Sequence, residues 1–169
     1  MARMMYLDAL EFLEEERDAF RPFEALDDLT DDQLQVPLEA AHGWSGRDLM
    51  GHLIDPLETA LAVARELAVD EASPTLVRAD EQWNAEGDAL NDRSVVEWAA
   101  LPITEVRDRF RSVPGELRCT LTVVPETRWL KHKTHMEWFM GETIDHYADH
   151  EADLAAVLAA AGATGSASG

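Results

Sequence analysis

The sequence predicts an all-α protein built as a four-helix bundle, and three observations carry this prediction. Apolar residues recur at helical offsets over four long segments. Ser and Thr side chains stand where helix N-caps belong. Strand-like alternation is absent except for a weak stretch at Leu121–Val124. We expect one helical domain over residues 1–160 and a disordered tail over residues 161–169, which contain only Ala, Gly, Thr and Ser.

The first predicted helix runs from Tyr6 to about Asp28, and the second runs from Ser45 to about Val69. The apolar stripe of the first helix comprises Tyr6, Leu10, Leu13, Phe20 and Phe23. Between the two helices, Thr30 to Gln33 has the spacing of a capping box and should open a short helical turn. Ser45 should cap the second helix, whose buried stripe comprises Leu49, Leu53, Ala60, Ala64 and Leu67.

A long crossover should join the second helix to the third. We expect a looser region around Ala72–Ala79 and then a short helical piece that carries Trp83 and fades near residues 87–91. Ser94 can cap the next segment, whose core stripe comprises Val106, Phe110, Val113, Leu117, Leu121 and Val124. Pro102 and Pro114 each remove a backbone donor, so breaks or kinks are expected there.

The last helix should begin near Thr134, where Glu137 completes a second capping-box pattern. Its inner stripe comprises Phe139, Thr143, His146, His150, Leu154 and Val157. Two histidines therefore occupy positions where packing alone would favour leucine. The four segments together predict the bundle.

The amino-acid composition limits the kinds of molecule that this chain can bind. The chain has 34 acidic and 14 basic residues, a formal charge of −20 that repels nucleic acid and anionic membranes. No apolar run approaches the roughly 20 residues needed to span a bilayer. The single cysteine, Cys119, has no partner for an internal disulfide, and we expect it in the core. We therefore expect a cytoplasmic protein with a small-molecule partner.

Three histidines form the candidate site. His146 and His150 are four residues apart, so on a helix both side chains lie on one face, within reach of one metal ion. The pair alone also fits a partly exposed or hydrogen-bonded structural feature. His52 can supply a third imidazole from another helix, which would leave coordination positions open for water or substrate. Asp55 and Glu142 are within helical reach and can orient a ligand ring, or can belong to the acidic surface.

Competing motifs fail on spacing. The two Glu-x-x-His repeats of a carboxylate-bridged di-iron bundle, the nucleophile-elbow motif and the phosphate-binding loop are all missing. His132 and His135 fit a cap or a pocket rim, and His42 stays unassigned in a loop. Most of the five tryptophans should fill the core, and some can wall an apolar pocket.

Two motifs resemble a known superfamily. Gly43–Leu53 is similar to the second-helix signature of the DinB/YfiT-like metal-binding bundles, and Gly141–His150 is similar to their fourth-helix signature. Asp80–Asn84 further resembles the subgroup of mycothiol-dependent maleylpyruvate isomerase N-terminal domains. The resemblance implies a four-helix bundle with a long crossover, often a homodimer, and one divalent metal ion, zinc or nickel, on His52, His146 and His150.

The same resemblance implies thiol-linked chemistry, with a low-molecular-weight thiol as cosubstrate. We therefore expect a metal-dependent thiol transferase, isomerase or hydrolase, with Asp55, Trp83, Asn84 and Glu142 near the metal or along the pocket. The alternatives are a binding or self-resistance protein that sequesters a reactive small molecule, and a helical dimerisation module with structural histidines. The chain ends soon after the predicted bundle, so we do not expect the additional C-terminal domain of the complete isomerase.

Overall fold

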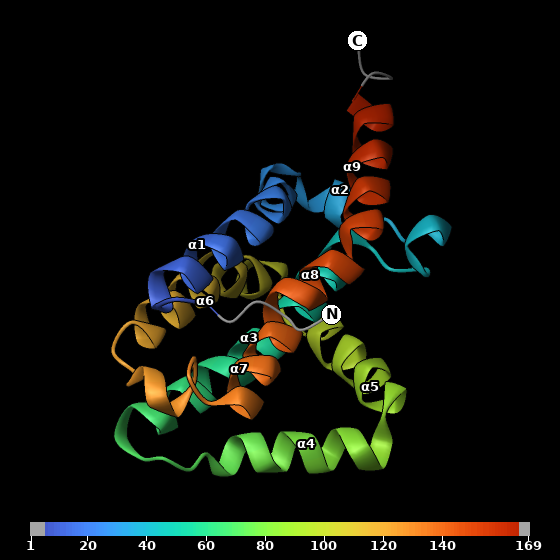
Figure 1. Cartoon of the computed structure of the whole chain (residues 1–169). Helices are drawn as coiled ribbons and strands as arrows, with labels where there is room; N and C mark the ends of the chain where they lie inside the picture. Colours follow the sequence, from blue (N-terminus) through green and yellow to red (C-terminus); the bar gives the residue numbers. More distant parts are fainter. Residues whose placement is uncertain (1–5, 166–169) are drawn as a thin grey trace.

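The fold is helical throughout the part of the chain that the structure describes. The structure is a computed structural model, which describes residues 6–165 and contains no strand within that range, so the weak pattern at Leu121–Val124 is not a strand (Figure 1). The elements are α1 (Ala9–Phe20), η1 (Arg21–Asp28), α2 (Asp31–Leu34), η2 (Glu39–Ala41), α3 (Gly46–Val69), α4 (Pro74–Glu86), α5 (Asp88–Ala99), α6 (Ile103–Leu121), η3 (Glu126–Arg128), α7 (Lys133–Met140), η4 (Gly141–Asp145), α8 (His146–Asp149) and α9 (Glu151–Gly165). The all-α prediction is confirmed.

The first predicted helix is two elements. Asp8 caps α1 by accepting a hydrogen bond from the Glu11 amide at 3.0 Å. The chain then tightens into the 3-10 segment η1, where Pro22 cannot donate to the preceding turn. Leu10 was predicted to be buried, but it is 66% exposed. The buried face of α1 instead includes Glu16, whose charged partner Arg118, on α6, could not be recognised from periodicity.

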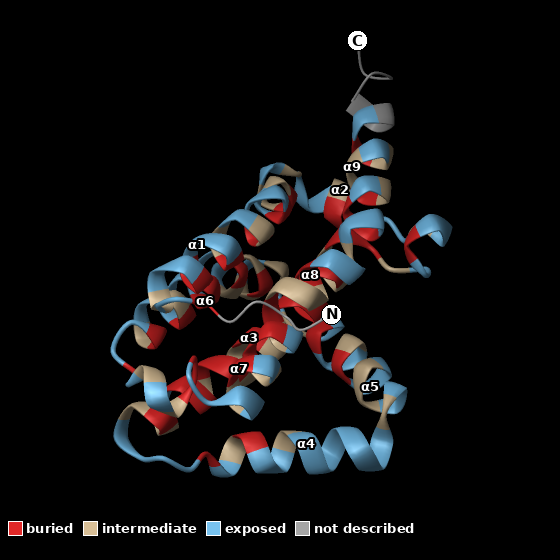
Figure 2. Cartoon of the chain, in the orientation of Figure 1, coloured by how far each residue is buried: buried red, intermediate tan, exposed pale blue. Residues whose placement is uncertain are grey.

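The central helix is α3, and it begins as predicted. The Ser45 amide donates to Asp48 at 2.9 Å, and the Asp48 amide donates back to the Ser45 hydroxyl at 3.3 Å, which completes a capping box. The predicted box at Thr30 and Gln33 is likewise present. Helix α3 packs against α4, α5 and α6, and buried positions concentrate along it (Figure 2). This cap sets the first turn of α3, one turn before His52.

Helices α4 and α5 connect α3 to α6. The region predicted to be loose is the start of α4, because the Ser73 hydroxyl accepts from the Leu76 amide at 3.1 Å and caps the helix. A turn at Gly87, with φ of 53°, leads into α5. Ser94 was predicted to cap a helix but lies inside α5 and is buried. A Cβ on Gly51 would lie 2.8 Å from Trp98, so α5 approaches α3 at a glycine beside His52.

Of the two prolines predicted to break or kink a helix, one does so and the other does not end its helix. Pro102 is the N-cap of α6, which confirms a break there, whereas α6 continues through Pro114. Cys119 is exposed rather than buried, because it lies on the outer face of α6. Within residues 6–165, no helix is both long and apolar enough to cross a membrane.

The last helical run is interrupted. Its cap is His132, whose Nδ1 accepts from the His135 amide at 3.3 Å, and not the predicted Thr134. A π-helical turn, η4, separates α7 from α8, and His150 leaves helical geometry between α8 and α9. Helix α9 extends to Gly165, past the predicted domain end at residue 160, and residues 166–169 of the predicted tail lie outside the described residues.

Candidate metal centre

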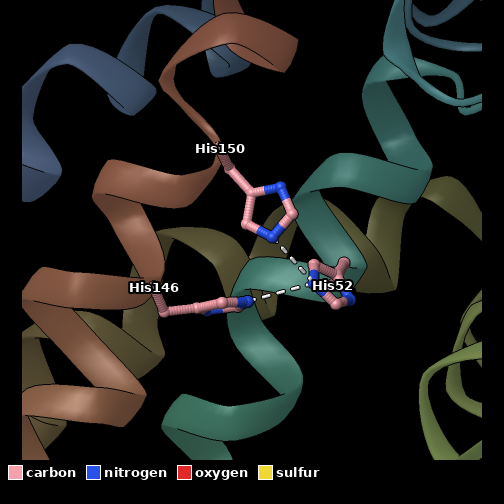
Figure 3. Close-up of side chains that lie close together, drawn as sticks. All are labelled: His52, His146 and His150. Atoms are coloured by element: carbon pink, nitrogen blue, oxygen red, sulfur yellow. Dashed lines mark hydrogen bonds between the residues drawn. The ribbon is translucent and has the colours of Figure 1, made fainter. Parts of the chain in front are cut away.

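The three predicted histidines meet at one point. His52 comes from α3, His146 is the first residue of α8, and His150 follows α8 (Figure 3). The Nε2 atoms of His146 and His150 each lie 3.0 Å from Nε2 of His52. The three candidate ligand atoms all lie within 4.8 Å of one another, so the trio could hold one metal ion. Tertiary structure thus brings together residues 94 and 98 positions apart.

Burial keeps two of these rings neutral. Desolvation, with the charges of His146 and His150, lowers the pKa of His52 to about 3. Desolvation and the charge of His150 lower the pKa of His146 to about 4. Both rings are therefore neutral at pH 7, which is the form in which imidazole donates a lone pair to a metal.

Hydrogen bonding inside the trio cannot account for its geometry. A ring nitrogen makes one good hydrogen bond, as either donor or acceptor. Nε2 of His52 nevertheless has two ring nitrogens at 3.0 Å, so one of the two contacts lacks a partner in any tautomer. Two nitrogens bound to one zinc ion are about 2.8–3.4 Å apart, given bonds of about 2.0–2.1 Å. A cation that accepts a lone pair from each ring fits both contacts.

An aspartate missed by the sequence analysis contacts His150. Nδ1 of His150 lies 2.8 Å from Oδ2 of Asp153, which is 3% exposed. Oδ1 of the same carboxylate lies 3.4 Å from Nε2 of His42. The spacing of three between His150 and Asp153 was a visible signal, since residues three apart are helical neighbours. It was lost among the many acidic residues of this chain.

A loop covers one side of the trio. Trp44 lies over His52 and His150, with ring centroids at 4.6 Å and 5.8 Å respectively. His42 and Gly43 both have positive φ, 59° and 82°, which turns the chain sharply before α3. His42, left unassigned from the sequence, therefore lies at the edge of the site. His132 and His135 stack on each other at the start of α7 and are not part of the cluster.

A pocket of about 910 Å³ opens beside the histidines, and it contains most of the other predicted site residues. Asp55, Trp83 and Glu142 line the pocket, whereas Asn84 is exposed and outside its lining. Trp44 and Trp138 also line it, so three of the five tryptophans face the pocket.

Asp55 and Glu142, predicted to orient a histidine ring, have other surroundings in the structure. Oδ1 of Asp55 accepts from the indole nitrogen of Trp98 at 3.0 Å. Nδ1 of His146 is buried and has no hydrogen-bond partner in the described part of the chain, so Glu142 does not orient that ring. Burial, together with the charges of Asp80 and Asp55, raises the pKa of Glu142 to about 7. Glu142 can therefore exchange a proton near neutral pH.

Comparison with known families agrees with the motif analysis. A family model for the mycothiol maleylpyruvate isomerase N-terminal domain matches residues 13–155. The chain belongs to this family. The match includes all three histidines as well as Asp153, and the predicted membership of the isomerase N-terminal subgroup is confirmed. Comparison with curated proteins and with solved structures yields no match.

Proposed function

We propose that this protein is a metal-dependent enzyme that acts on an electrophilic small molecule with the help of a small thiol. It either joins the thiol to this molecule or uses the thiol to isomerise it. The observation that carries the proposal is the pair of 3.0 Å contacts at His52, which a shared cation fits and hydrogen bonds do not. Membership of a family described by a mycothiol-linked isomerase supports the thiol part.

His52, His146 and His150 would hold the ion, and zinc or nickel suits three imidazoles. A divalent ion there would lower the pKa of a bound thiol or water and so provide a nucleophile at neutral pH. Three protein ligands leave coordination positions open, which is typical of catalytic and not of structural zinc sites.

The chain's own residues would complete the site. Trp44 covers His52 and His150 and keeps bulk water from that side. Glu142 lines the same pocket as His146 and, with its pKa near 7, can accept the proton that a thiol loses or return one to the product. Asp55 and Asp80 sustain this role, because their negative charges help to keep the Glu142 carboxyl protonated near neutral pH.

The finer architectural predictions belong to this proposal. The runs α1, α3, α6 and α7 to α9 support a four-helix bundle in which α4 and α5 form the crossover. The homodimer and the cytoplasmic location stay predictions. Equilibrium sedimentation of the metal-loaded protein tests the first of these.

The decisive experiment has two steps. Metal analysis of freshly purified, untagged protein should find about one divalent ion per chain, and a metal-free preparation would contradict the proposal. The loaded protein is then incubated with low-molecular-weight thiols and a panel of electrophiles. Product in excess of protein indicates an enzyme, whereas loss of one electrophile per chain without turnover would replace the enzyme with a sequestration protein.

A further inference from the structure

Asp153 is the residue that the proposed function leaves without a role, and its surroundings are unusual. It is a carboxylate on α9, 3% exposed, in a chain whose other acids lie mostly on the surface. Burial of an ionised carboxylate is costly unless hydrogen bonds compensate it. Its partners are two histidines from different parts of the chain, His150 at 2.8 Å and His42 at 3.4 Å.

The contact with His150 decides where that ring carries its proton. A carboxylate only accepts hydrogen bonds, so Nδ1 of His150 must be the donor to Asp153 Oδ2. The proton on Nδ1 leaves the lone pair of a neutral ring on Nε2, the atom that faces His52. Without the carboxylate, the proton could move to Nε2 and block the lone pair.

The contact with Asp153 acts at a break in the helix. His150 lies between α8 and α9 with φ of −109° and ψ of 9°, outside helical geometry. Its ring contacts that of His146 edge to face, with centroids 4.8 Å apart, but such a contact does not fix which ring nitrogen carries the proton. The contact of Nδ1 with Asp153, together with Trp44 stacked at 5.8 Å, fixes the orientation of the His150 ring.

We propose that Asp153 is a positioning residue that holds His150 in the Nδ1–H tautomer and aims its Nε2 at the metal position. This inference rests on the proposed function, because it assigns a metal-binding purpose to the tautomer. His146, whose Nδ1 has no partner among the described residues, has no equivalent restraint. Asp153 thereby distinguishes the two histidines of the pair.

The test compares four variants of the full-length protein. Zinc affinity is measured by competition with a chromophoric chelator. The tautomer of His150 is measured by long-range ¹H–¹⁵N correlation in metal-free protein labelled with ¹⁵N-histidine. A further variant, His150→Ala, serves only to assign the His150 signals. Asp153→Ala should lower zinc affinity about 10- to 100-fold and shift the proton of His150 toward Nε2. Asp153→Asn keeps the side-chain volume but places an amide, which can donate as well as accept, beside Nδ1, so it should also shift the proton of His150 toward Nε2.

Two controls separate this role from charge and from the loop. Glu151→Gln removes one negative charge from an exposed position next to His150, and His42→Ala removes the other partner of Asp153. Both should stay within about threefold of wild-type affinity, well below the loss expected for Asp153→Ala. Equal affinity in Asp153→Ala and wild type, a wild-type proton on Nε2, or an equal loss in His42→Ala would each overturn the inference. If wild type binds no zinc, the proposed function fails, and the tautomer measurement still decides whether Asp153 sets the proton of His150.

Discussion

Two polar clusters adjoin α8, and they differ in how completely their hydrogen-bonding groups are paired. Tyr147 donates to Oε1 of Glu16 at 2.8 Å, and Arg118 from α6 donates to both oxygens of the same carboxylate. We call these three residues the core triad. His146, which precedes Tyr147 in the chain, belongs instead to the histidine trio, where one contact of His52 has no hydrogen-bonding explanation.

The comparison separates a structural cluster from a candidate functional one. In the core triad, donors meet acceptors: the pKa of Tyr147 is raised well above its usual value by burial and by the charge of Glu16, so its hydroxyl stays protonated and donates. In the histidine trio, three ring nitrogens converge on a common point. Convergent lone pairs suit a shared cation, whereas matched donors and acceptors stabilise the fold. The clusters should therefore respond to mutation in opposite ways.

Glu16→Ala should produce the largest effect, on stability and not on metal binding. It leaves Arg118, mostly buried, without its partner, which costs about 3–5 kcal/mol of unfolding free energy for a buried ion pair. Urea denaturation measures this loss. Zinc affinity of the folded fraction should match wild type, and a comparable loss of affinity would show that the two clusters are coupled.

His150→Ala should have the complementary effect. Removal of a ligand should cost at least about 100-fold in zinc affinity, because outer-shell partners alone are worth about 10- to 100-fold. Chelator competition measures the affinity, and circular dichroism should report nearly unchanged helix content. An unchanged metal stoichiometry would remove His150 from the ligand set.

Glu142→Gln should change the pH dependence of stability in metal-free protein. The folded-state pKa of Glu142, about 7, is above its ordinary value of 4.5, so the folded state binds the extra proton and stability falls as pH rises from about 5 to 7. The glutamine variant lacks this loss and should gain about 2 kcal/mol relative to wild type between pH 5 and pH 8.

The matched control for that prediction is Glu137→Gln, an exposed position on α7. Urea denaturation of all three proteins at both pH values gives the comparison. The histidine trio acts in the opposite direction, because the lowered pKa values of His52 and His146 increase stability as pH rises toward 6.5. Only the difference between variants isolates Glu142, and a difference independent of pH would contradict the raised pKa.

Tyr147→Phe should give the smallest effect. It removes one donor to Glu16 but keeps the ring against Phe20 and Phe23, so the expected loss is about 1 kcal/mol. Thermal unfolding of the variant checks this value. A loss as large as that of Glu16→Ala would mean that the hydroxyl, and not the ion pair with Arg118, holds the triad together.

Most of the predictions that were correct depend on interactions between residues close in sequence, and most of those that were wrong depend on contacts between distant parts of the chain. Both early capping boxes were predictable, because each is a hydrogen-bond pattern within four residues. The Ser94 and Thr134 caps were wrong, because buried packing of α5 and the ring of His132 took precedence over local propensity. Leu10 is exposed because the inner face of α1 is formed by Phe12, Leu13, Glu16 and Phe20, with Glu16 held there by a partner 102 residues away.

The amino-acid sequence by itself determined the helical class, the family and the three histidines, because helical periodicity and imidazole chemistry are readable from residue type and spacing. Tertiary structure alone decided that Asp153 holds His150, that Trp44 covers the trio, and that Glu142 titrates near neutrality. These properties depend on desolvation and on contacts between distant segments, and neither is encoded in any short stretch of the chain.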